Sequence, residues 1–395
     1  MNSRPDPRRS AVAILTVVLA ILPIRLSTAH AGPPMGWNSW NHFSDKVTET
    51  DIRKAADALV TSGMAAAGYR YVIIDDGWQG TRDASGVLHS NPRSFPNMKA
   101  LADYVHARGL KFGIYSSPGP KTCAGFTGSS GHETEDARQF AAWGVDYLKY
   151  DLCSLRGALN GRPLAIQKEA SIVAFQRMHE ALDATGRPIV YALSTYGWNR
   201  VWEWGASVGA STWRTTTDIG PSYTSMIFNA LGTQAIPPLD DTDHWNDPDM
   251  LEIGNDGFDA SGEARTHMTL WAMLAAPLIA GNDLSALRPE TREILTNRDL
   301  IKVDQDRGSR AGRMIRWDGA IQTWRRDLSD GSTVMALVNT LDHEIDDRAN
   351  DVLAPDVLQR KARDLWTHRD VAPFSGQESL TIGMRDVLVL RFAPK

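Results

Sequence analysis

Short apolar segments alternate with helical patterns along the first three quarters of the chain, and this alternation restricts the fold more than any other feature. Four segments are rich in Val, Ile, Tyr and Phe and have the length of buried strands: 71–75, 111–115, 145–151 and 188–193. Weaker segments of the same kind lie at 35–37, 211–214, 245–247 and 277–280. The chain therefore carries eight candidate strands before residue 281.

Helical patterns fill the intervals between these strands. Thr48 and Asp51 resemble a capping box, and apolar residues follow at helical spacing from Ile52 to Val60. Further helical patterns fit 97–108, 133–143, 165–184, 222–231, 262–274 and 288–297. Because strands that alternate with helices form parallel sheets covered on both faces, this order predicts an α/β fold, a (β/α)8 TIM barrel over residues 32–308. A doubly wound open sheet is the alternative, but no G-x-G-x-x-G motif follows any of these strands.

After about residue 308 the pattern changes to alternation of apolar and polar residues. Segments 314–317, 320–324, 333–338 and 387–392 have this pattern, and Asp318-Gly319 and Asp330-Gly331 supply turns. The pattern predicts a small C-terminal antiparallel β-sandwich domain over 309–395. Because no low-complexity linker separates the two parts, we expect them to share an apolar interface.

The first 31 residues have the three parts of a secretory signal peptide. An Arg-containing start precedes an apolar run at 11–24, and Ala29-His30-Ala31 is a candidate cleavage site. The alternative is an uncleaved anchor, which Arg25 after the apolar run leaves open. The segment predicts a secreted or periplasmic protein that has no membrane association after cleavage. In such an oxidising compartment, Cys123 and Cys153 could pair.

Composition excludes several classes of protein. With 42% hydrophobic and 23% charged residues, the chain has the composition of a globular protein, and a net charge of −5 argues against a nucleic-acid partner. No H-E-x-x-H, G-x-S-x-G or P-loop motif is present, and we expect neither a cofactor nor a metal. Asp240, Asp241, Asp243 and His244 could form a metal cluster, but they match no ligand spacing, and a solvated loop is the preferred interpretation.

Carboxylates and aromatic residues gather where the predicted strands end. Asp75, Asp76, Asp151, Asp218, Asp247 and Asp249 follow such strands, as do Trp37, Trp40, Trp78, Tyr115, Trp213 and Trp245. The carboxyl ends of barrel strands carry the active site, carboxylates accept hydrogen bonds from hydroxyls, and flat rings cover the apolar face of a sugar. Two carboxylates on different strands could also hydrolyse a glycoside. The alternatives are that the Asp residues cap helices and that the Trp residues fill the core.

Six motifs in order carry a resemblance to a known family. They are Pro34–Asn41, Ile74–Trp78, Lys111–Tyr115 with Lys121–Cys123, Asp146–Asp151, Trp213–Ile219 and Trp245–Met250. Together they resemble the α-galactosidase (melibiase) family, glycoside hydrolase family 27, and the match covers essentially the whole chain after residue 31. The fold that this resemblance implies, a (β/α)8 barrel plus a C-terminal β domain, agrees with the fold expected from periodicity.

The resemblance also implies roles for individual residues. It makes Asp151 the nucleophile and Asp218 the general acid/base of a retaining hydrolysis through a covalent glycosyl-enzyme. Lys149, two residues before Asp151 on one strand, would point the same way, and we expect its ammonium to lower the pKa of Asp151. The resemblance further implies a galactoside-binding site and a disulfide between Cys123 and Cys153 beside the nucleophile. The implied substrate contacts are Asp75 and Asp76 at hydroxyls 4 and 6, Lys149 at O3 and O4, Arg214 on the O2 side, Trp40 on the ring face, and Tyr115, Asp249 and Met250 along the pocket.

One departure from the family pattern bears on the substrate. Many α-galactosidases carry Cys-Glu-Trp after the fifth strand, whereas this chain has Leu193-Ser194-Thr195-Tyr196-Gly197. Small residues there, Ser194 and Gly197, could admit a 2-acetamido group, so α-N-acetylgalactosaminidase activity is an alternative. β-L-Arabinopyranosidase activity is a lesser one, because Asp75 and Asp76 suit a sugar that keeps its C6 arm. A sugar-binding protein without catalysis is disfavoured by the presence of both Asp151 and Asp218.

Overall fold

The computed structural model describes residues 32–237, 239, 243–256, 258, 262–308 and 310–395. The predicted signal peptide at 1–31 lies outside the described residues, as do Asp240 and Asp241 of the proposed acidic loop. Eight parallel strands form one sheet in the order β10-β1-β2-β5-β6-β7-β8-β9, which confirms the predicted barrel strands. They are β1 (Met35–Asn38), β2 (Tyr71–Ile73), β5 (Lys111–Ser116), β6 (Tyr147–Asp151), β7 (Val190–Ser194), β8 (Thr212–Arg214), β9 (Trp245–Asp247) and β10 (Leu278–Ala280).

The barrel closes through one residue that follows β9. Leu251 forms a parallel bridge with Ala280 of β10. Its amide donates to the carbonyl of Ile279 at 2.8 Å, and its carbonyl accepts from Gly281 at 3.0 Å. Pro248, which has no amide hydrogen, stands between β9 and Leu251, so the strand cannot run on without interruption. The chain leaves the sheet for the interval 248–250 and returns to complete the cylinder.

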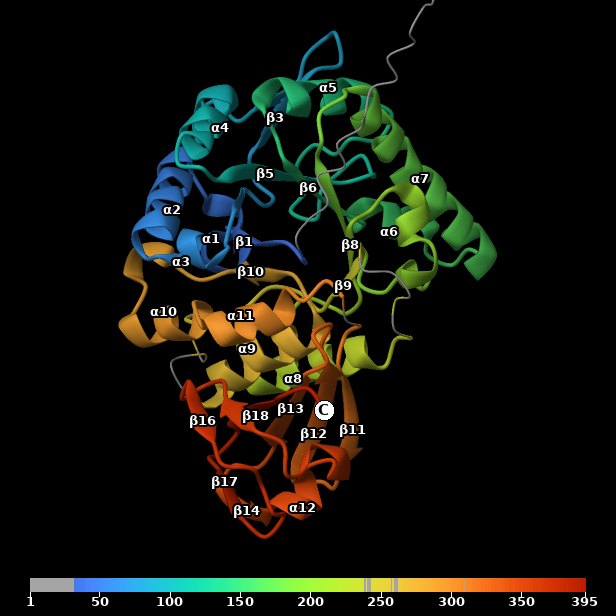
Figure 1. Ribbon diagram of the computed structural model, residues 1–395. Helices are drawn as coiled ribbons and strands as arrows, with labels where there is room; N and C mark the ends of the chain where they lie inside the picture. The colour runs from blue at the N-terminus through green and yellow to red at the C-terminus, as the bar shows by residue number, and fades with distance from the viewer. Residues whose placement is uncertain (1–31, 238, 240–242, 257, 259–261, 309) are drawn as a thin grey trace, which may run out of the picture.

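Helices cover the outside of this barrel (Figure 1). The capping box predicted at Thr48 and Asp51 is present and starts α2. The barrel helices are α1 (Trp40–Phe43), α2 (Glu49–Thr61), α3 (Met64–Ala67), α4 (Met98–His106), α5 (Glu133–Trp143), α6 (Cys153–Leu159), α7 (Leu164–Ala184), α8 (Tyr223–Gln234), α9 (Gly262–Leu274), α10 (Pro289–Leu295) and α11 (Arg298–Asp304). Short 3-10 helices lie at Ser44–Lys46, Val201–Glu203, Gly205–Val208 and Leu284–Ala286, and a hairpin of β3 (Gln79–Arg82) and β4 (Leu88–Ser90) follows β2.

The C-terminal part is antiparallel, as the alternating pattern predicted. Its larger sheet has the order β11-β12-β13-β18-β15-β16, and its smaller sheet pairs β14 with β17. Apolar side chains from both sheets, including Leu337, Leu380 and Phe392, meet in one buried cluster, as expected for a sandwich. The elements are β11 (Arg313–Trp317), β12 (Ile321–Asp327), β13 (Thr333–Asn339), β14 (Ile345–Arg348), α12 (Ala349–Val352), the 3-10 helix Pro355–Val357, β15 (Ala362–Asp364), β16 (Arg369–Val371), β17 (Ser379–Ile382) and β18 (Val387–Phe392).

An apolar interface joins the sandwich to the barrel, as expected from the absence of a linker. Trp324 and Val389 of the sandwich belong to the same buried cluster as the barrel residues Leu270 and Trp271. Arg326 of β12 donates to the carbonyl of Ala272 in α9 at 2.6 Å. The sandwich lies below α8 and α9, on the side of the barrel that these helices cover (Figure 1).

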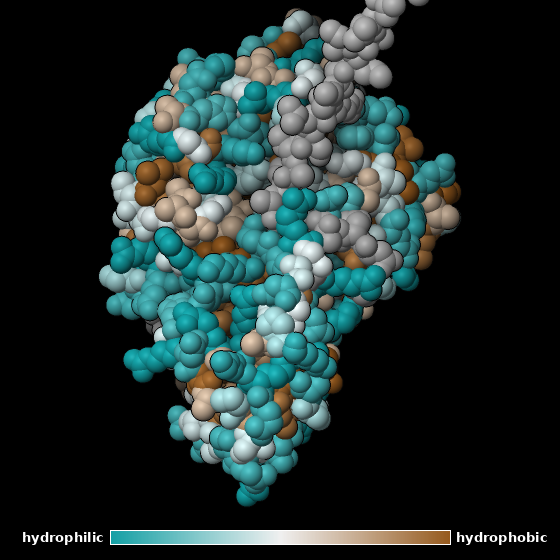
Figure 2. Space-filling model, viewed as in Figure 1, coloured by the Kyte–Doolittle hydropathy of each residue, from teal (hydrophilic) through white to brown (hydrophobic). Residues whose placement is uncertain are grey.

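The face of the molecule in Figure 2 is mostly hydrophilic, with hydrophobic residues scattered in small patches. Within the described ranges, no helix combines the length and the apolar character that crossing a membrane requires.

Candidate active site

A cavity of about 190 Å³ lies where the barrel strands end, and it collects side chains from seven strands or the loops that follow them. It is smaller than the pockets of about 300–1,000 Å³ that hold drug-sized ligands, so it suits one small ring. All of the predicted catalytic and substrate-contact residues line it except two, Ser194 and Gly197. The lining residues are Trp40, Asn41, Ser44, Asp75, Asp76, Tyr115, Cys123, Lys149, Asp151, Tyr196, Arg214, Asp218, Ile219, Asp249 and Met250.

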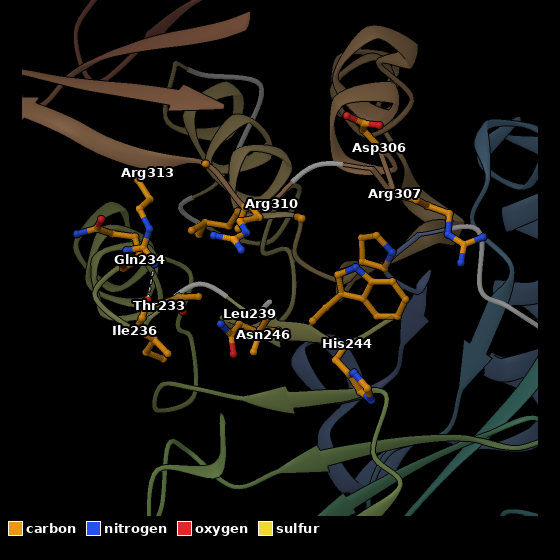
Figure 3. A pocket seen from close by; sticks show the side chains of 16 residues that line it. Thr233, Gln234, Ile236, Leu239, His244, Asn246, Asp306, Arg307, Arg310 and Arg313 are labelled. Atoms are coloured by element: carbon orange, nitrogen blue, oxygen red, sulfur yellow. Dashed lines mark hydrogen bonds between the residues drawn. The ribbon is translucent and has the colours of Figure 1, made fainter. Parts of the chain in front are cut away.

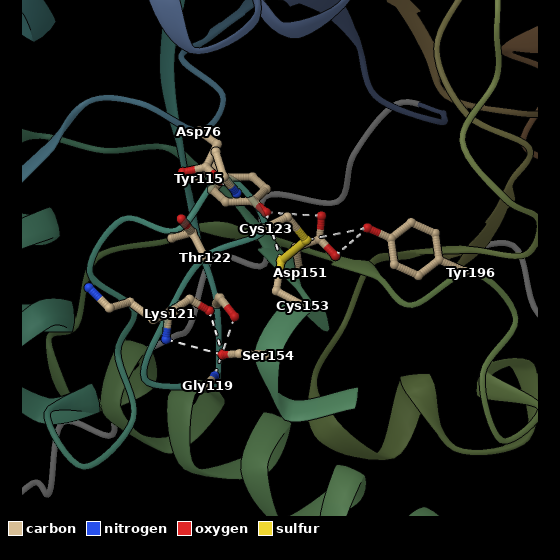
Figure 4. Close-up of a disulfide and its surroundings, with 12 residues drawn as sticks. Asp76, Tyr115, Gly119, Lys121, Thr122, Cys123, Asp151, Cys153, Ser154 and Tyr196 are labelled. Atoms are coloured by element: carbon tan, nitrogen blue, oxygen red, sulfur yellow. Dashed lines mark hydrogen bonds between the residues drawn. A yellow bond between two sulfur atoms is a disulfide. The ribbon is translucent and has the colours of Figure 1, made fainter. Parts of the chain in front are cut away.

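Asp151 ends β6 and is only 4% exposed. Two tyrosine hydroxyls donate to its carboxylate, one to each oxygen (Figure 4): Tyr115 to Oδ2 at 3.1 Å and Tyr196 to Oδ1 at 2.7 Å. Because two donors on opposite oxygens restrict rotation of the carboxylate, the side chain is held in one orientation before any ligand enters.

The charge state of Asp151 is set by burial against two opposing effects. Burial raises the pKa of Asp151 to about 6, while the Lys149 ammonium and the Tyr196 hydroxyl act to lower it. As expected, the Lys149 ammonium acts to lower the pKa of Asp151. The expectation that this pKa would be lowered overall was wrong, because desolvation of the buried carboxylate is the larger effect. At neutral pH Asp151 is therefore mostly ionised.

Asp218 differs from Asp151 in its exposure. Its side chain is 72% exposed, and Arg214 donates to its Oδ1 at 3.1 Å. Arg214 also pairs with buried Asp249, whose Oδ1 lies 2.9 Å from Nη1. The other oxygen of Asp249 accepts from the amide of Ile219 at 2.8 Å, so one carboxylate holds both Arg214 and the backbone next to Asp218.

The opposite wall of the cavity carries the paired carboxylates after β2. Asp75 Oδ2 accepts from Lys149 Nζ at 2.8 Å and from Asn38 Nδ2 at 2.7 Å. Asp76 Oδ2 accepts from the amide of Ala124 at 2.8 Å. Burial raises the pKa of Asp76 to about 6, with the backbone donor at Ala124 opposing this rise. Asp75 and Asp76 therefore present acceptors to the cavity from a fixed position.

A disulfide joins Cys123 to Cys153 next to Asp151 (Figure 4). The hydroxyl of Tyr115 lies 3.0 Å from Sγ of Cys153, and the residue after Cys123 supplies the amide that binds Asp76. Cys123, Asp151 and Cys153 form a group of potential metal ligands, but the disulfide removes both thiolates. The disulfide therefore links the loop after β5 to the residues around the buried carboxylate.

Four residues of the cavity were not predicted as site residues: Asn41, Ser44, Tyr196 and Ile219. Asn41 directly follows Trp40, and Ile219 directly follows Asp218, so neighbours of predicted residues could have been included. Tyr196 had a stronger signal, because it is an aromatic residue only two positions after the end of β7, close to a strand end as the predicted aromatic site residues are.

Ser194 and Gly197, predicted to widen the pocket, do not line it. Ser194 is 1% exposed and borders a smaller cavity inside the barrel, together with Ala192 and Asp247. Gly197 has a φ of +74°, and a Cβ there would lie 2.5 Å from the carbonyl oxygen of Thr215. Position 197 therefore requires glycine because of its positive φ and the close Thr215 carbonyl, whatever substrate the pocket binds.

Most of the tryptophans near the strand ends are core residues, so the idea that they form the pocket is corrected. Trp40 lines the cavity, whereas Trp37, Trp78 and Trp213 are at most 1% exposed. The last three donate their indole N–H groups to Asn282, Tyr115 and Asn246, respectively. Since successive side chains of a strand point to opposite faces, Trp37 and Trp213 pack outward against the helices.

A second cavity lies away from the predicted site residues, between the segment after α11 and the residues around β9 (Figure 3). His244 and Arg307 line it, and none of the predicted catalytic or substrate-contact residues does. Asp243, from the acidic segment considered as a metal site, lies 3.2 Å from Arg307, and His244 stacks on Trp213. The two described residues of that segment, Asp243 and His244, therefore contact other side chains of the protein.

Comparison with known proteins agrees with this architecture. The profile of the family described as alpha galactosidase A matches residues 32–306, and that of the alpha galactosidase C-terminal beta sandwich domain matches 318–392. Among similar proteins, the alpha-galactosidase of Cyamopsis tetragonoloba is 39% identical over 89% of this chain and 83% of its own. Alpha-galactosidase A of Cellvibrio japonicus is 44% identical over 80% of this chain and 78% of its own.

A solved structure extends the similarity to three dimensions. Alpha-galactosidase I of Mortierella vinacea is 33% identical and superposes with a TM-score of 0.83, covering 93% of this chain and 98% of its own. The family profiles, the relatives and the barrel-plus-sandwich structure lead to one assignment: the chain is a glycoside hydrolase and belongs to the α-galactosidase family.

Proposed function

We propose that this protein hydrolyses terminal α-D-galactosyl residues of oligosaccharides or polysaccharides and retains the anomeric configuration. The observation that carries this proposal is the pairing of a buried carboxylate, Asp151, with an exposed one, Asp218, in a single cavity of one-ring size. The family supports the sugar, since the relatives that match over most of the chain are alpha-galactosidases. A homologous alpha-galactosidase from Saccharomyces cerevisiae, 25% identical with a TM-score of 0.83, was solved with raffinose.

In the first step, the protonated Asp218 carboxyl donates its proton to the glycosidic oxygen while the Asp151 carboxylate attacks C1 from the β face. The C1–oxygen bond breaks, the aglycone leaves as an alcohol, and a β-galactosyl ester forms on Asp151. In the second step, the Asp218 carboxylate takes a proton from water, and the resulting hydroxide equivalent attacks C1 from the α face. The ester bond breaks, Asp151 leaves as a carboxylate, and α-galactose is released.

The exposure of the two carboxylates fits these roles. Asp151 needs no exchange with solvent, because it is ionised at the start and at the end of the cycle. Asp218 loses and regains a proton in every cycle, and its 72% exposed side chain lies where a leaving alcohol and an incoming water can reach it.

The remaining wall residues are proposed to bind the galactose ring. Asp75 and Asp76 would accept from hydroxyls 4 and 6, Lys149 would donate to O3 and O4, and Trp40 would cover the ring face. Tyr115, Arg214, Asp249 and Met250 complete the enclosure of the ring, with Arg214 on the O2 side. The existing bond from Lys149 to Asp75 supports this arrangement, because it fixes a hydrogen-bond donor beside an acceptor on the wall of the cavity.

A panel of aryl glycosides tests the substrate. Release of p-nitrophenol from the α-galactoside should exceed release from the α-N-acetylgalactosaminide and the β-L-arabinopyranoside. Faster release from either of the last two substrates would show that the enzyme acts on that sugar and not on galactose. Proton NMR of the first product should show α-galactose, and β-galactose would contradict retention.

Azide rescue separates the two carboxylates. In Asp151→Ala, azide can attack C1 directly from the β face, so β-galactosyl azide should form. In Asp218→Ala, azide can attack the ester from the α face, so α-galactosyl azide should form. The reverse pair of products would exchange the two roles.

We also infer that residues 1–31 direct export, and that the two domains divide near residue 308. The disulfide supports export, because such bonds persist in oxidising compartments. The division is supported by the end of α11 at Asp304 and the start of β11 at Arg313. N-terminal sequencing of exported protein should begin at Gly32, and an intact Met1 would refute cleavage.

A further inference from the structure

Glu252 is a buried carboxylate that the two-step reaction does not use. It is 2% exposed and directly follows Leu251, the residue that closes the barrel. Its Oε1 accepts a hydrogen bond from Nδ2 of Asn41, which lines the catalytic cavity together with Trp40. We propose that Glu252 is a positioning residue: it holds the Asn41 amide so that the side-chain oxygen of Asn41 accepts a hydrogen bond from a hydroxyl of the bound sugar.

The hydrogen bonds of Glu252 decide which end of the Asn41 amide is available. Its second oxygen, Oε2, accepts from Nδ2 of Asn255. An ionised carboxylate accepts at both oxygens and donates at neither, so it selects the nitrogen end of each asparagine. With the nitrogen of Asn41 bonded to Glu252, Oδ1 is the atom of Asn41 that can accept from a ligand.

Packing on both sides limits the movement of this pair. A Cβ at Gly281 would lie 3.0 Å from Cβ of Asn41, so the backbone after β10 runs close to the Asn41 side chain. Two residues after Glu252, Gly254 has a φ of +95°, and a Cβ there would lie 2.8 Å from Cγ2 of Thr291. The contact therefore joins the segment after β1 to the segment after β9 across the end of β10.

The charge of Glu252 favours a role in the site over a role in folding alone. Burial raises the pKa of Glu252 to about 7 and the Asp249 carboxylate adds to this rise, whereas the amides of Asn255 and Asn41 oppose it. Among the described residues, no cationic side chain pairs with Glu252. Because an ionised carboxylate without a cation is costly to bury, a neutral side chain would serve a purely structural contact better.

This inference rests on the proposed function, which places a galactose ring in the cavity. In the closed order of eight strands, β1 stands opposite β7, and the neighbours of β7 are β6 and β8. Asn41 follows β1, whereas Asp151 ends β6 and Asp218 follows β8. Asn41 thus meets the sugar across the barrel from the bond that breaks. An interaction there contributes equally to the ground state and the transition state, so its loss should raise KM and leave kcat unchanged.

An exchange of the amide and the carboxylate tests the contact, with steady-state kinetics on p-nitrophenyl α-galactoside at pH 8, where Glu252 is mostly ionised. In Asn41→Asp two carboxylates face each other, so KM should rise by at least about fivefold with kcat nearly unchanged. Adding Glu252→Gln supplies an amide that donates to residue 41 and still accepts from Asn255, so KM should return to near the wild-type value. Glu252→Gln alone keeps an oxygen for Asn41 and should change KM little.

Asn255→Ala is the matched control, because it removes the donor to the other oxygen of Glu252 and leaves the cavity lining intact. It should lower the melting temperature without raising KM. The affinity for free galactose, measured by calorimetry, should follow KM in all variants. A double variant no better than Asn41→Asp, or an equal rise of KM in Asn255→Ala, would overturn the role of Glu252. A wild type that cleaves no α-galactoside would instead overturn the proposed function itself, so the two failures are distinct.

Discussion

Arg214 and Asp249 form an ion pair with 2.9 Å between Nη1 and Oδ1, and their side chains are only 4% and 5% exposed. Asp249 takes part in this pair from a strained position, with a φ of +97°. The indole of Trp271 donates to the carbonyl of Asp249 at 2.6 Å, and this bond stabilises the turn. The pair therefore connects the helix layer, through Trp271, to the side chain that contacts Asp218.

Asp249→Asn should destabilise the fold by about 3 kcal/mol, because the buried Arg214 charge loses its buried partner and keeps only the exposed Asp218 beside it. Asn tolerates positive φ as Asp does, so the backbone turn is not the cause of the loss. Urea unfolding measures the change. The exposed pair of Lys99 and Asp103 is the control, and Asp103→Asn should change stability by less than about 1 kcal/mol. Equal losses in the two variants would contradict the argument.

The rate should fall in acid with an apparent pKa of about 6. The attacking carboxylate must be ionised, and burial raises the pKa of Asp151 to about 6, so protonation below that pH removes the nucleophile. The profile of kcat/KM against pH measures this limb. Asp76 also has a pKa raised to about 6 by burial, so Asp76→Asn is the control. The limb should persist in that variant, and its disappearance would assign the limb to Asp76.

Asp151→Asn should be more stable than the wild type at pH 8. The folded-state pKa of Asp151, about 6, lies above the unfolded value of about 3.9, so the ionised form costs stability. The cost is fully present above about pH 6 and vanishes below about pH 4. We expect a gain of about 1–3 kcal/mol at pH 8 that disappears at pH 4. Melting temperatures at the two pH values measure it, and a variant less stable than wild type at pH 8 would refute the prediction.

The double variant Cys123→Ser/Cys153→Ser should lose both stability and substrate affinity. The disulfide closes a loop of 30 residues, and its loss should cost about 3–4 kcal/mol by the loop-entropy argument. The amide of Ala124, which binds Asp76, would no longer be fixed, so KM should rise by a larger factor than kcat falls. Steady-state kinetics at a temperature where the variant is folded separate the two effects. A fall in kcat alone would place the effect on Asp151.

The barrel was predictable because its strands are short β-branched segments that end in charged or polar residues. Tyr71–Ile73 and Tyr147–Asp151 are strands at the predicted positions, and Thr48 caps its helix as expected. The hairpin of β3 and β4 was not predicted, since Gln79–Arg82 and Leu88–Ser90 have few apolar residues. Their pairing depends on packing against neighbouring loops, which local pattern does not encode.

Site residues were predictable to the extent that strand ends converge in a barrel. Convergence places Asp75, Lys149 and Asp151 in one cavity, but it does not say which way each side chain points. Trp213 and Ser194 also lie near strand ends, and the structure turns the first outward and the second toward the barrel interior. The direction in which each side chain points depends on strand register and on turn geometry, such as the positive φ of Tyr196. Only the assembled barrel determines these features.

The single-residue closure at Leu251 has a consequence for local unfolding. The segment after β9 is joined to β10 by only two backbone hydrogen bonds, both made by Leu251. A full pairing of two strands supplies more. Asp249 lies in the interval that precedes this bridge, whereas Asp151 lies in β6, paired on both sides by β5 and β7. If the barrel opens at this junction, we expect the interval 248–250, which positions Asp249, to lose order before β6, which is hydrogen-bonded on both sides. The two carboxylates of one reaction thus stand on parts of the barrel with unequal resistance to opening.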